Sequence, residues 1–121
     1  MILQDNTTKT CGQCCLAEIL GITLEESILL IGHDRGTTSK QLTQHFNSAP
    51  NKRGIPSVYA LCKLRWKKDN GDMEPNWHWI LHKDGQIYDP GLGQYLRIDG
   101  YFNAVDARIT SYFEIHETQK D

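Results

Sequence analysis

The hydrophobic pattern of this chain changes its period near the middle, and this change limits the folds it can adopt. Residues 12–20, "GQCCLAEIL", are almost all apolar or small, and Gly21 is a typical C-terminal stop for a helix. After residue 57 apolar and polar residues alternate instead, as they do in strands. Helices first and antiparallel strands afterwards predict an α+β fold.

Three helices are expected in the first half. A helix over residues 12–20 would be apolar on nearly every side, so it belongs in the middle of the fold. Two more begin with capping-box signatures and should end at Gly32 and near Phe46. The N-cap residues and their partners three positions later are Thr23 with Glu26 and Thr38 with Gln41.

Four strands are expected in the second half, over residues 57–66, 77–82, 86–89 and 107–116. The segment "NSAPNKRGIP" before them and "KDNGDMEPN" between the first two are polar and rich in turn residues, so we interpret both as loops. The predicted architecture is a buried central helix, with further N-terminal helices, packed on a C-terminal antiparallel sheet.

Length and charge place the chain in a broad class. Its 121 residues predict one domain, 1–121, large enough to fold without disulfides or metal. The net charge of −2 gives no electrostatic reason to expect a nucleic acid partner. The basic strip "KLRWKK" at 63–68 is interpreted as an exposed strand edge defended by lysines, in preference to a phosphate site.

The sequence also suggests a compartment. It has no run of 18 apolar residues for a membrane span, and "MILQDNTTKT" lacks the basic and apolar regions of a signal peptide. We therefore expect a cytoplasmic protein with no membrane partner, whose thiols stay reduced.

Three of the four cysteines lie within "CGQCC". A zinc site needs four ligands, yet no second Cys pair follows and the histidines are dispersed, so no metal or cofactor is predicted. A thioredoxin-like motif would follow a strand, and only ten residues precede Cys11. Cys11 instead begins the first helix, where free N–H groups and the helix dipole favour a thiolate. Cys14 and Cys15 are interpreted as core residues. Buried packing remains the alternative for Cys11 itself.

A base and its orienting group are expected from the hairpin "WHWILHKDGQIYDPG". If residues 84–85, Asp-Gly, form a two-residue type I′ turn, Ile80 lies opposite Asp89. His78, Ile80 and His82 then share one face, and Asp89 falls on it as a diagonal neighbour of His78. His82 lies nearer the turn, where we expect it to be solvated, so His78 is preferred as the base. A half-buried strand histidine and an Asp-Pro turn remain the alternatives.

Acyl transfer also needs donors for an oxyanion. The backbone N–H of Cys11 can supply one. Gln4 is the candidate for a side-chain donor, and Asn6 is its competitor.

The blocks "Q…CGQCCLAEILG" and "HWIL…IYDPG" resemble the papain-like cysteine peptidases, most closely the bacteriocin-processing double-glycine leader peptidases (C39-like) and their small standalone relatives. The resemblance implies a papain-like fold and assigns catalytic roles. It makes Cys11 the nucleophile, His78 the base, Asp89 its orienter and Gln4 the oxyanion donor. It also matches Cys15 to a structural second cysteine. Gln4 lies seven positions before Cys11, where the family usually has six.

The expected function is therefore a cysteine-nucleophile hydrolase, a peptidase, isopeptidase or amidase, acting on a peptide or protein through a thioester. The middle region is similar to small bacterial or phage proteins, no transporter is implied, and little room is left for an N-terminal propeptide. The alternatives are a glutamine deamidase or acyltransferase with the same triad, a catalytically silent binding module, and a redox module using Cys11 and Cys14.

Overall fold

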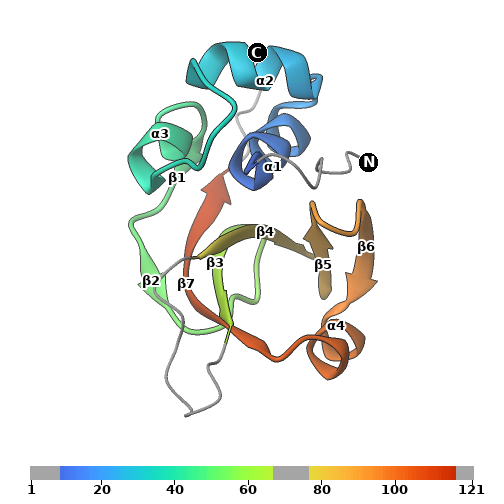
Figure 1. Cartoon of the computed structure of the whole chain (residues 1–121). Helices are drawn as coiled ribbons and strands as arrows, with labels where there is room; N and C mark the ends of the chain where they lie inside the picture. Colours follow the sequence, from blue (N-terminus) through green and yellow to red (C-terminus); the bar gives the residue numbers. More distant parts are fainter. Residues whose placement is uncertain (1–8, 67–76, 117–121) are drawn as a thin grey trace.

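A computed structural model describes residues 9–66 and 77–116 of the chain. Within these ranges the fold is α+β, with helices from the N-terminal part packed on an antiparallel sheet formed by the C-terminal part (Figure 1). The predictions for Gln4, Asn6 and the loop at 68–76 lie outside the described residues. In the described ranges, each helix is too short or too polar to cross a membrane.

The first three helices begin where the sequence indicates. They are α1 (Cys11–Leu20), α2 (Leu24–Ile31) and α3 (Ser39–Thr43). The capping boxes at Thr23 and Thr38 are both formed, and the helices α1 and α2 end at glycines with left-handed backbone. Helix α3 ends at Thr43, earlier than the predicted Phe46.

Helix α1 is the central helix, as predicted. Every residue from Cys11 to Ala17 is buried, and the helix contacts α2, α3 and β4 (His78–Lys83). Such burial on all sides is the reason why this segment contains only small and apolar residues apart from Gln13.

The sheet has the strand order β1-β7-β3-β4-β5-β6, with β2 also paired to β7, and every pair is antiparallel. The remaining strands are β1 (Asn47–Ser48), β2 (Lys52–Arg53), β3 (Ala60–Trp66), β5 (Gln86–Asp89), β6 (Gln94–Arg97) and β7 (Ala107–His116). Helix α4 (Ile98–Ala104) follows β6 and contacts β5 and β6 (Figure 1).

The two faces of the sheet carry separate hydrophobic clusters. Trp79 and Leu81 of β4 pack with α1, whereas Ile80 between them packs with Ile87 and with Tyr101 of α4. This alternation is the period-two pattern that the sequence shows. The sheet is therefore covered by α1 on one face and by α4 on the other.

Strands β5 and β7 have the predicted bounds, whereas the other two predicted strands and the predicted loop need corrections. Strand β3 begins at Ala60 instead of residue 57, and β4 is shifted by one residue from 77–82. The segment 47–56, predicted as a loop, contains the short strands β1 and β2. Strand β6 and helix α4 were not predicted.

The interpretation of the basic strip at 63–68 as a strand edge is wrong for residues 63–66. Strand β3 is hydrogen-bonded on both sides, to β4 and to β7, because the last strand of the chain returns beside it. Lys63 is half-buried, and its ammonium lies 4.7 Å from the centre of the Trp77 ring, a cation–π contact. Residues 67 and 68 lie outside the described ranges.

The close contact at Gly12 gives a test of the packing around α1. A β-carbon there would overlap with Oγ1 of Thr37 and lie 3.0 Å from Cδ1 of Trp79. We expect Gly12→Ala to lower the free energy of unfolding by about 1–3 kcal/mol, measured by urea denaturation.

Gly100 provides the matched control, because it lies in α4 with nothing within 4 Å of the position of a β-carbon. Gly100→Ala should leave stability unchanged or raise it by about 0.5–1 kcal/mol. Equal stability of the Gly12→Ala variant and the wild type would contradict the contact.

Candidate active site

Cys11 is the first residue of α1, and Thr10 occupies the N-cap position before it. The N-cap residue, Thr10, makes no side-chain capping hydrogen bond. The N–H groups of the first turn therefore lack that partner, and they favour negative charge nearby. Cys11 is 9% exposed and reaches a cleft.

The hairpin that carries His78 and Asp89 has the predicted register. Asp84 and Gly85 have φ values of 53° and 73°, which a type I′ turn requires, and His82 pairs with Ile87. Asp89 then falls diagonally opposite His78, and His78 Nε2 lies 2.5 Å from Asp89 Oδ1. The two side chains form a hydrogen-bonded pair that is mostly shielded from water.

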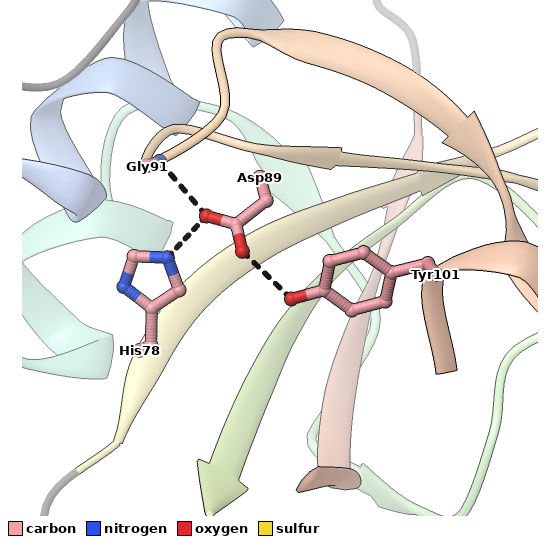
Figure 2. Close-up of polar contacts among 4 residues, drawn as sticks. All are labelled: His78, Asp89, Gly91 and Tyr101. Atoms are coloured by element: carbon pink, nitrogen blue, oxygen red, sulfur yellow. Dashed lines mark hydrogen bonds and ion pairs between the residues drawn. The ribbon is translucent and has the colours of Figure 1, made fainter. Parts of the chain in front are cut away.

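Three elements hold the Asp89 carboxylate (Figure 2). Oδ1 accepts hydrogen bonds from His78 and from the backbone N–H of Gly91, at 2.8 Å, while Oδ2 accepts one from the Tyr101 hydroxyl at 2.7 Å. Burial raises the pKa of Asp89, but the donors and the charge of His78 outweigh it and hold this pKa below its ordinary value of 3.8. The carboxylate therefore stays ionised and fixes the imidazole ring.

Asp89 thus also begins a turn. The bond from Gly91 N–H two residues on is an Asx-turn contact, the alternative role that the sequence suggested for an Asp-Pro pair. The turn and the contact with His78 occur together, since one carboxylate oxygen accepts both bonds.

The charge of His78 depends on its two partners. Burial lowers its pKa, but hydrogen bonds and charge interactions with Asp89 and Cys11 raise it, to about 9 in total. At neutral pH the ring is then an imidazolium. Because Asp89 occupies Nε2, Nδ1 is the nitrogen that remains for Cys11. The ring of Trp66 lies beside the imidazole, with 5.5 Å between the ring centres.

Cys11 and His78 both line a cleft of about 500 Å³. Its walls come from the first turn of α1, the segment before α3, the end of β3 and the start of β4. The lining residues are Lys9, Cys11, Gly36, Thr37, Thr38, Trp66, Trp77, His78 and Trp79. A ligand in this cleft would lie against the thiol and the imidazole together.

The other three cysteines are fully buried, and all four are free thiols. Burial raises the pKa of Cys14 to about 11 and also raises the pKa values of Cys15 and Cys62. These thiols remain protonated and unexposed, so the prediction that Cys14 and Cys15 are core residues is confirmed.

The expectation that His82 is solvated is wrong. It is 4% exposed, and its Nδ1 lies 2.6 Å from the carbonyl oxygen of Val58. The segment before β3 covers the strand end near the turn, which the local pattern could not indicate. His82 has a structural hydrogen bond there and does not line the cleft.

In the described residues, no three His, Cys, Asp or Glu side chains are grouped as a metal site would require. Gln4 and Asn6 lie outside these residues, so their predicted role stays a prediction.

Three residues of the site were not assigned by the sequence. Tyr101 supports Asp89 from α4, Trp66 lies beside His78, and Thr37 lines the cleft. These three residues are brought to the site by long-range packing, which leaves no local signal in the sequence. The hydrogen bond from the Gly91 N–H to Asp89, by contrast, had a local signal in the Asp-Pro-Gly sequence.

Comparisons of the chain with protein-family models, with curated proteins and with solved structures found no match. The case for a function therefore depends on Cys11 and His78, which line the cleft, and on Asp89, which is hydrogen-bonded to His78. Such an arrangement can perform nucleophilic acyl transfer.

The raised pKa of His78 predicts a pH dependence of stability. Because the folded pKa of about 9 exceeds the ordinary 6.5, the stabilisation is complete below the lower value and is lost as pH rises through the upper one. The wild type should exceed His78→Gln in free energy of unfolding, and this gap should shrink by on the order of 2 kcal/mol over that range. Urea denaturation across the pH series measures it, and a constant gap would contradict the assignment.

The Tyr101 hydroxyl supports a charged group inside the protein, so its removal should be costly. Burial and the Asp89 carboxylate raise the pKa of Tyr101, which keeps the phenol protonated as a donor. Tyr101→Phe should lower the free energy of unfolding by about 1.5–3 kcal/mol. Tyr95→Phe is the control, because no described group accepts a hydrogen bond from its hydroxyl, and it should change stability by less than about 0.5 kcal/mol. Equal effects of both substitutions would argue against the bond.

Proposed function

We propose that this protein is a papain-like cysteine hydrolase that cleaves an amide bond of a peptide or protein through a thioester on Cys11. The observation that carries the proposal is the position of His78. Its Nε2 is bound to Asp89, its pKa is raised by interaction with Cys11, and both Cys11 and His78 line one cleft. A nucleophile, a base and an orienting carboxylate in this order are the elements of a catalytic triad.

The charges support the thiolate as the attacking species. The His78 imidazolium and the first turn of α1 both place positive charge beside the Cys11 sulfur. Both favour a negatively charged sulfur, which is the reactive form of a thiol. Asp89 keeps the imidazolium oriented, because its other oxygen is held by Tyr101.

In the acylation step, the Cys11 sulfur forms a bond with the carbonyl carbon, and the electrons of the C=O double bond move to oxygen. The Cys11 backbone N–H, and Gln4 as the resemblance suggests, hold this oxyanion. When the double bond re-forms, the C–N bond breaks and the nitrogen takes a proton from His78. The neutral imidazole then removes a proton from water, which attacks the thioester and releases the acid and the thiolate.

The papain-like fold belongs to the same proposal. It is supported by a buried helix that carries the nucleophile at its N-terminus and packs on an antiparallel sheet carrying the histidine and the aspartate. The motif resemblance in the sequence points the same way.

An acyl-transfer assay tests the function without knowledge of the substrate. We expect p-nitrophenyl acetate to give a burst of p-nitrophenolate equal to one acetyl group per protein, and mass spectrometry to locate that group on Cys11. His78→Ala should slow the burst by roughly 10²- to 10⁴-fold. The Cys11→Ser variant should give no burst.

Cys14→Ser is the matched control, since Cys14 lies in the same motif but is fully buried. It should keep the burst within about twofold of wild type, whereas a redox pair with Cys11 would require both thiols. Absence of acylation of the wild type between about pH 6 and 9, or acylation that persists in Cys11→Ser, would overturn the proposal.

A further inference from the structure

Basic side chains from three neighbouring strands share one face of the sheet. The strands β2, β7, β3 and β4 lie side by side in this order (Figure 1). Lys63 of β3 lies directly opposite Ser111 of β7, and Ser111 lies opposite Arg53 of β2. Arg65, two positions after Lys63, lies opposite Arg108 of β7. Residues in these relations point to the same side of a sheet, so Arg53, Lys63, Arg65 and Arg108 form one basic patch.

The basic patch adjoins the cleft through two indole rings. Lys63 lies opposite Trp79 of β4, and its ammonium lies 4.7 Å from the centre of the Trp77 ring and 5.6 Å from that of the Trp79 ring. The guanidinium carbon of Arg65 lies 5.9 Å from the centre of the Trp77 ring. Both tryptophans line the cleft together with Cys11. The positive charges therefore lie against the cleft wall.

The charges of the basic patch are not neutralised by neighbouring carboxylates. Two of its members, on β2 and β7, are exposed, while Lys63 and Arg65 are half-buried. Within residues 9–66 and 77–116, none of the four forms an ion pair with a carboxylate. Lys52, on the opposite face of β2, is by contrast paired with Glu114 at 3.2 Å. The basic patch is thus free to pair with an anion from another molecule.

Crowding of like charges makes such an anion favourable. Burial and the charge of Arg65 lower the pKa of Lys63, and a bound anion would offset the repulsion between neighbouring cations. Lys9 adds a further exposed cation on the cleft wall itself. The chain as a whole has a net charge of −2, so this concentration of cations is local to the cleft and the adjoining sheet face.

We propose that the basic patch binds an acidic segment of the peptide or protein whose amide bond is cleaved at Cys11. The inference rests on the proposed hydrolase function and names the charge of its substrate. The scissile amide lies in the cleft beside Cys11 and His78, and the acidic side chains extend past Trp77 onto β3, β7 and β2. Lys63 and Arg65 are the specificity-determining residues nearest to the cleft.

The chemistry of the cleft favours a peptide over a nucleic acid. Aromatic rings beside basic side chains also bind single-stranded nucleic acids, so the basic patch alone does not separate the two. The thiol and the imidazole that line the same cleft are suited to attack on an acyl group. Arginine also pairs well with carboxylates, because its planar fork can donate two hydrogen bonds to one of them.

The test uses two peptides that alkylate Cys11 and differ only in charge. Each carries an N-terminal iodoacetyl group, a Gly-Gly spacer and a C-terminal amide, with a tetraglutamate tail in one and a tetraglutamine tail in the other. We expect the wild type to react roughly three- to tenfold faster with the glutamate peptide at about 20 mM NaCl. This ratio should fall toward one at about 500 mM NaCl, because salt screens the charges. Mass spectrometry locates the alkylated residue.

Substitutions in the basic patch assign the preference to its residues. The double variant Lys63→Gln, Arg65→Gln should lower the ratio of the two rates at low salt to less than about twofold. Because each ratio compares two peptides on one variant, a change in the reactivity of Cys11 cancels. Thermal unfolding reports folding, and Arg108→Gln, at an exposed position of the basic patch, replaces the double variant if that one does not fold.

Lys83→Gln is the matched control. Lys83 also lies over an aromatic ring, with its ammonium 5.1 Å from the centre of the Tyr59 ring, but it is at the other end of β4 from His78. This variant should keep the wild-type ratio.

Equal rates of the wild type with both peptides, or a preference that persists in the variants of the basic patch, would overturn the inference. Protection of Cys11 by an oligothymidylate, with no preference between the peptides, would identify a nucleic acid as the occupant and would overturn it as well. Alkylation does not require acyl transfer. A wild type that prefers the glutamate peptide but is not acylated by p-nitrophenyl acetate would therefore overturn the proposed function instead, and the two failures are distinguishable.

Discussion

The packing of α1 against β4 joins the two halves of this fold. The first seven residues of the helix are buried, and Cys15 and Leu16 share a hydrophobic cluster with Trp79 and Leu81. Helix and sheet have different hydrophobic periods, and this contact is where both bury their apolar faces. The same contact places the first residue of α1, Cys11, beside the first residue of β4, His78.

The polar groups of the site lie next to this apolar contact, so their charges need partners. Asp89 obtains them from β4, from the turn after β5 and from α4. Burial lowers the pKa of His78, but its interactions with Asp89 and Cys11 raise this pKa and so favour the charged imidazolium. The Asp89 carboxylate and the His78 imidazolium thus stabilise each other in their ionised forms.

Sequence reasoning succeeded where the determining interactions are local. The capping boxes at Thr23 and Thr38 and the type I′ turn at 84–85 each depend on residues within four positions. The turn alone set the register that brings His78 to Asp89. These local signals, with the cysteine at a helix start, were sufficient to propose three members of the site.

The missed features depend on contacts between distant segments. Strand β3 lies inside the sheet because β7 returns beside it, which made the edge interpretation of Lys63 wrong. His82 is covered by Val58, 24 residues away. Tyr101 reaches Asp89 from a helix that was not predicted, and nothing near Thr37 in the sequence signals a neighbour of Gly12. Periodicity and motif spacing carry no information on such pairs.

The three clustered cysteines show how one helix can separate chemistry from packing. Cys14 and Cys15 lie in the interior, where burial raises the pKa of each thiol and keeps it neutral. Cys11 lies at the helix start, beside a positively charged imidazole and at the cleft. Cys11 therefore has different surroundings from Cys14 and Cys15 because it lies three or four positions before them on the same helix. Gly12 belongs to this arrangement, because a side chain there would displace Thr37 from the cleft wall next to Cys11.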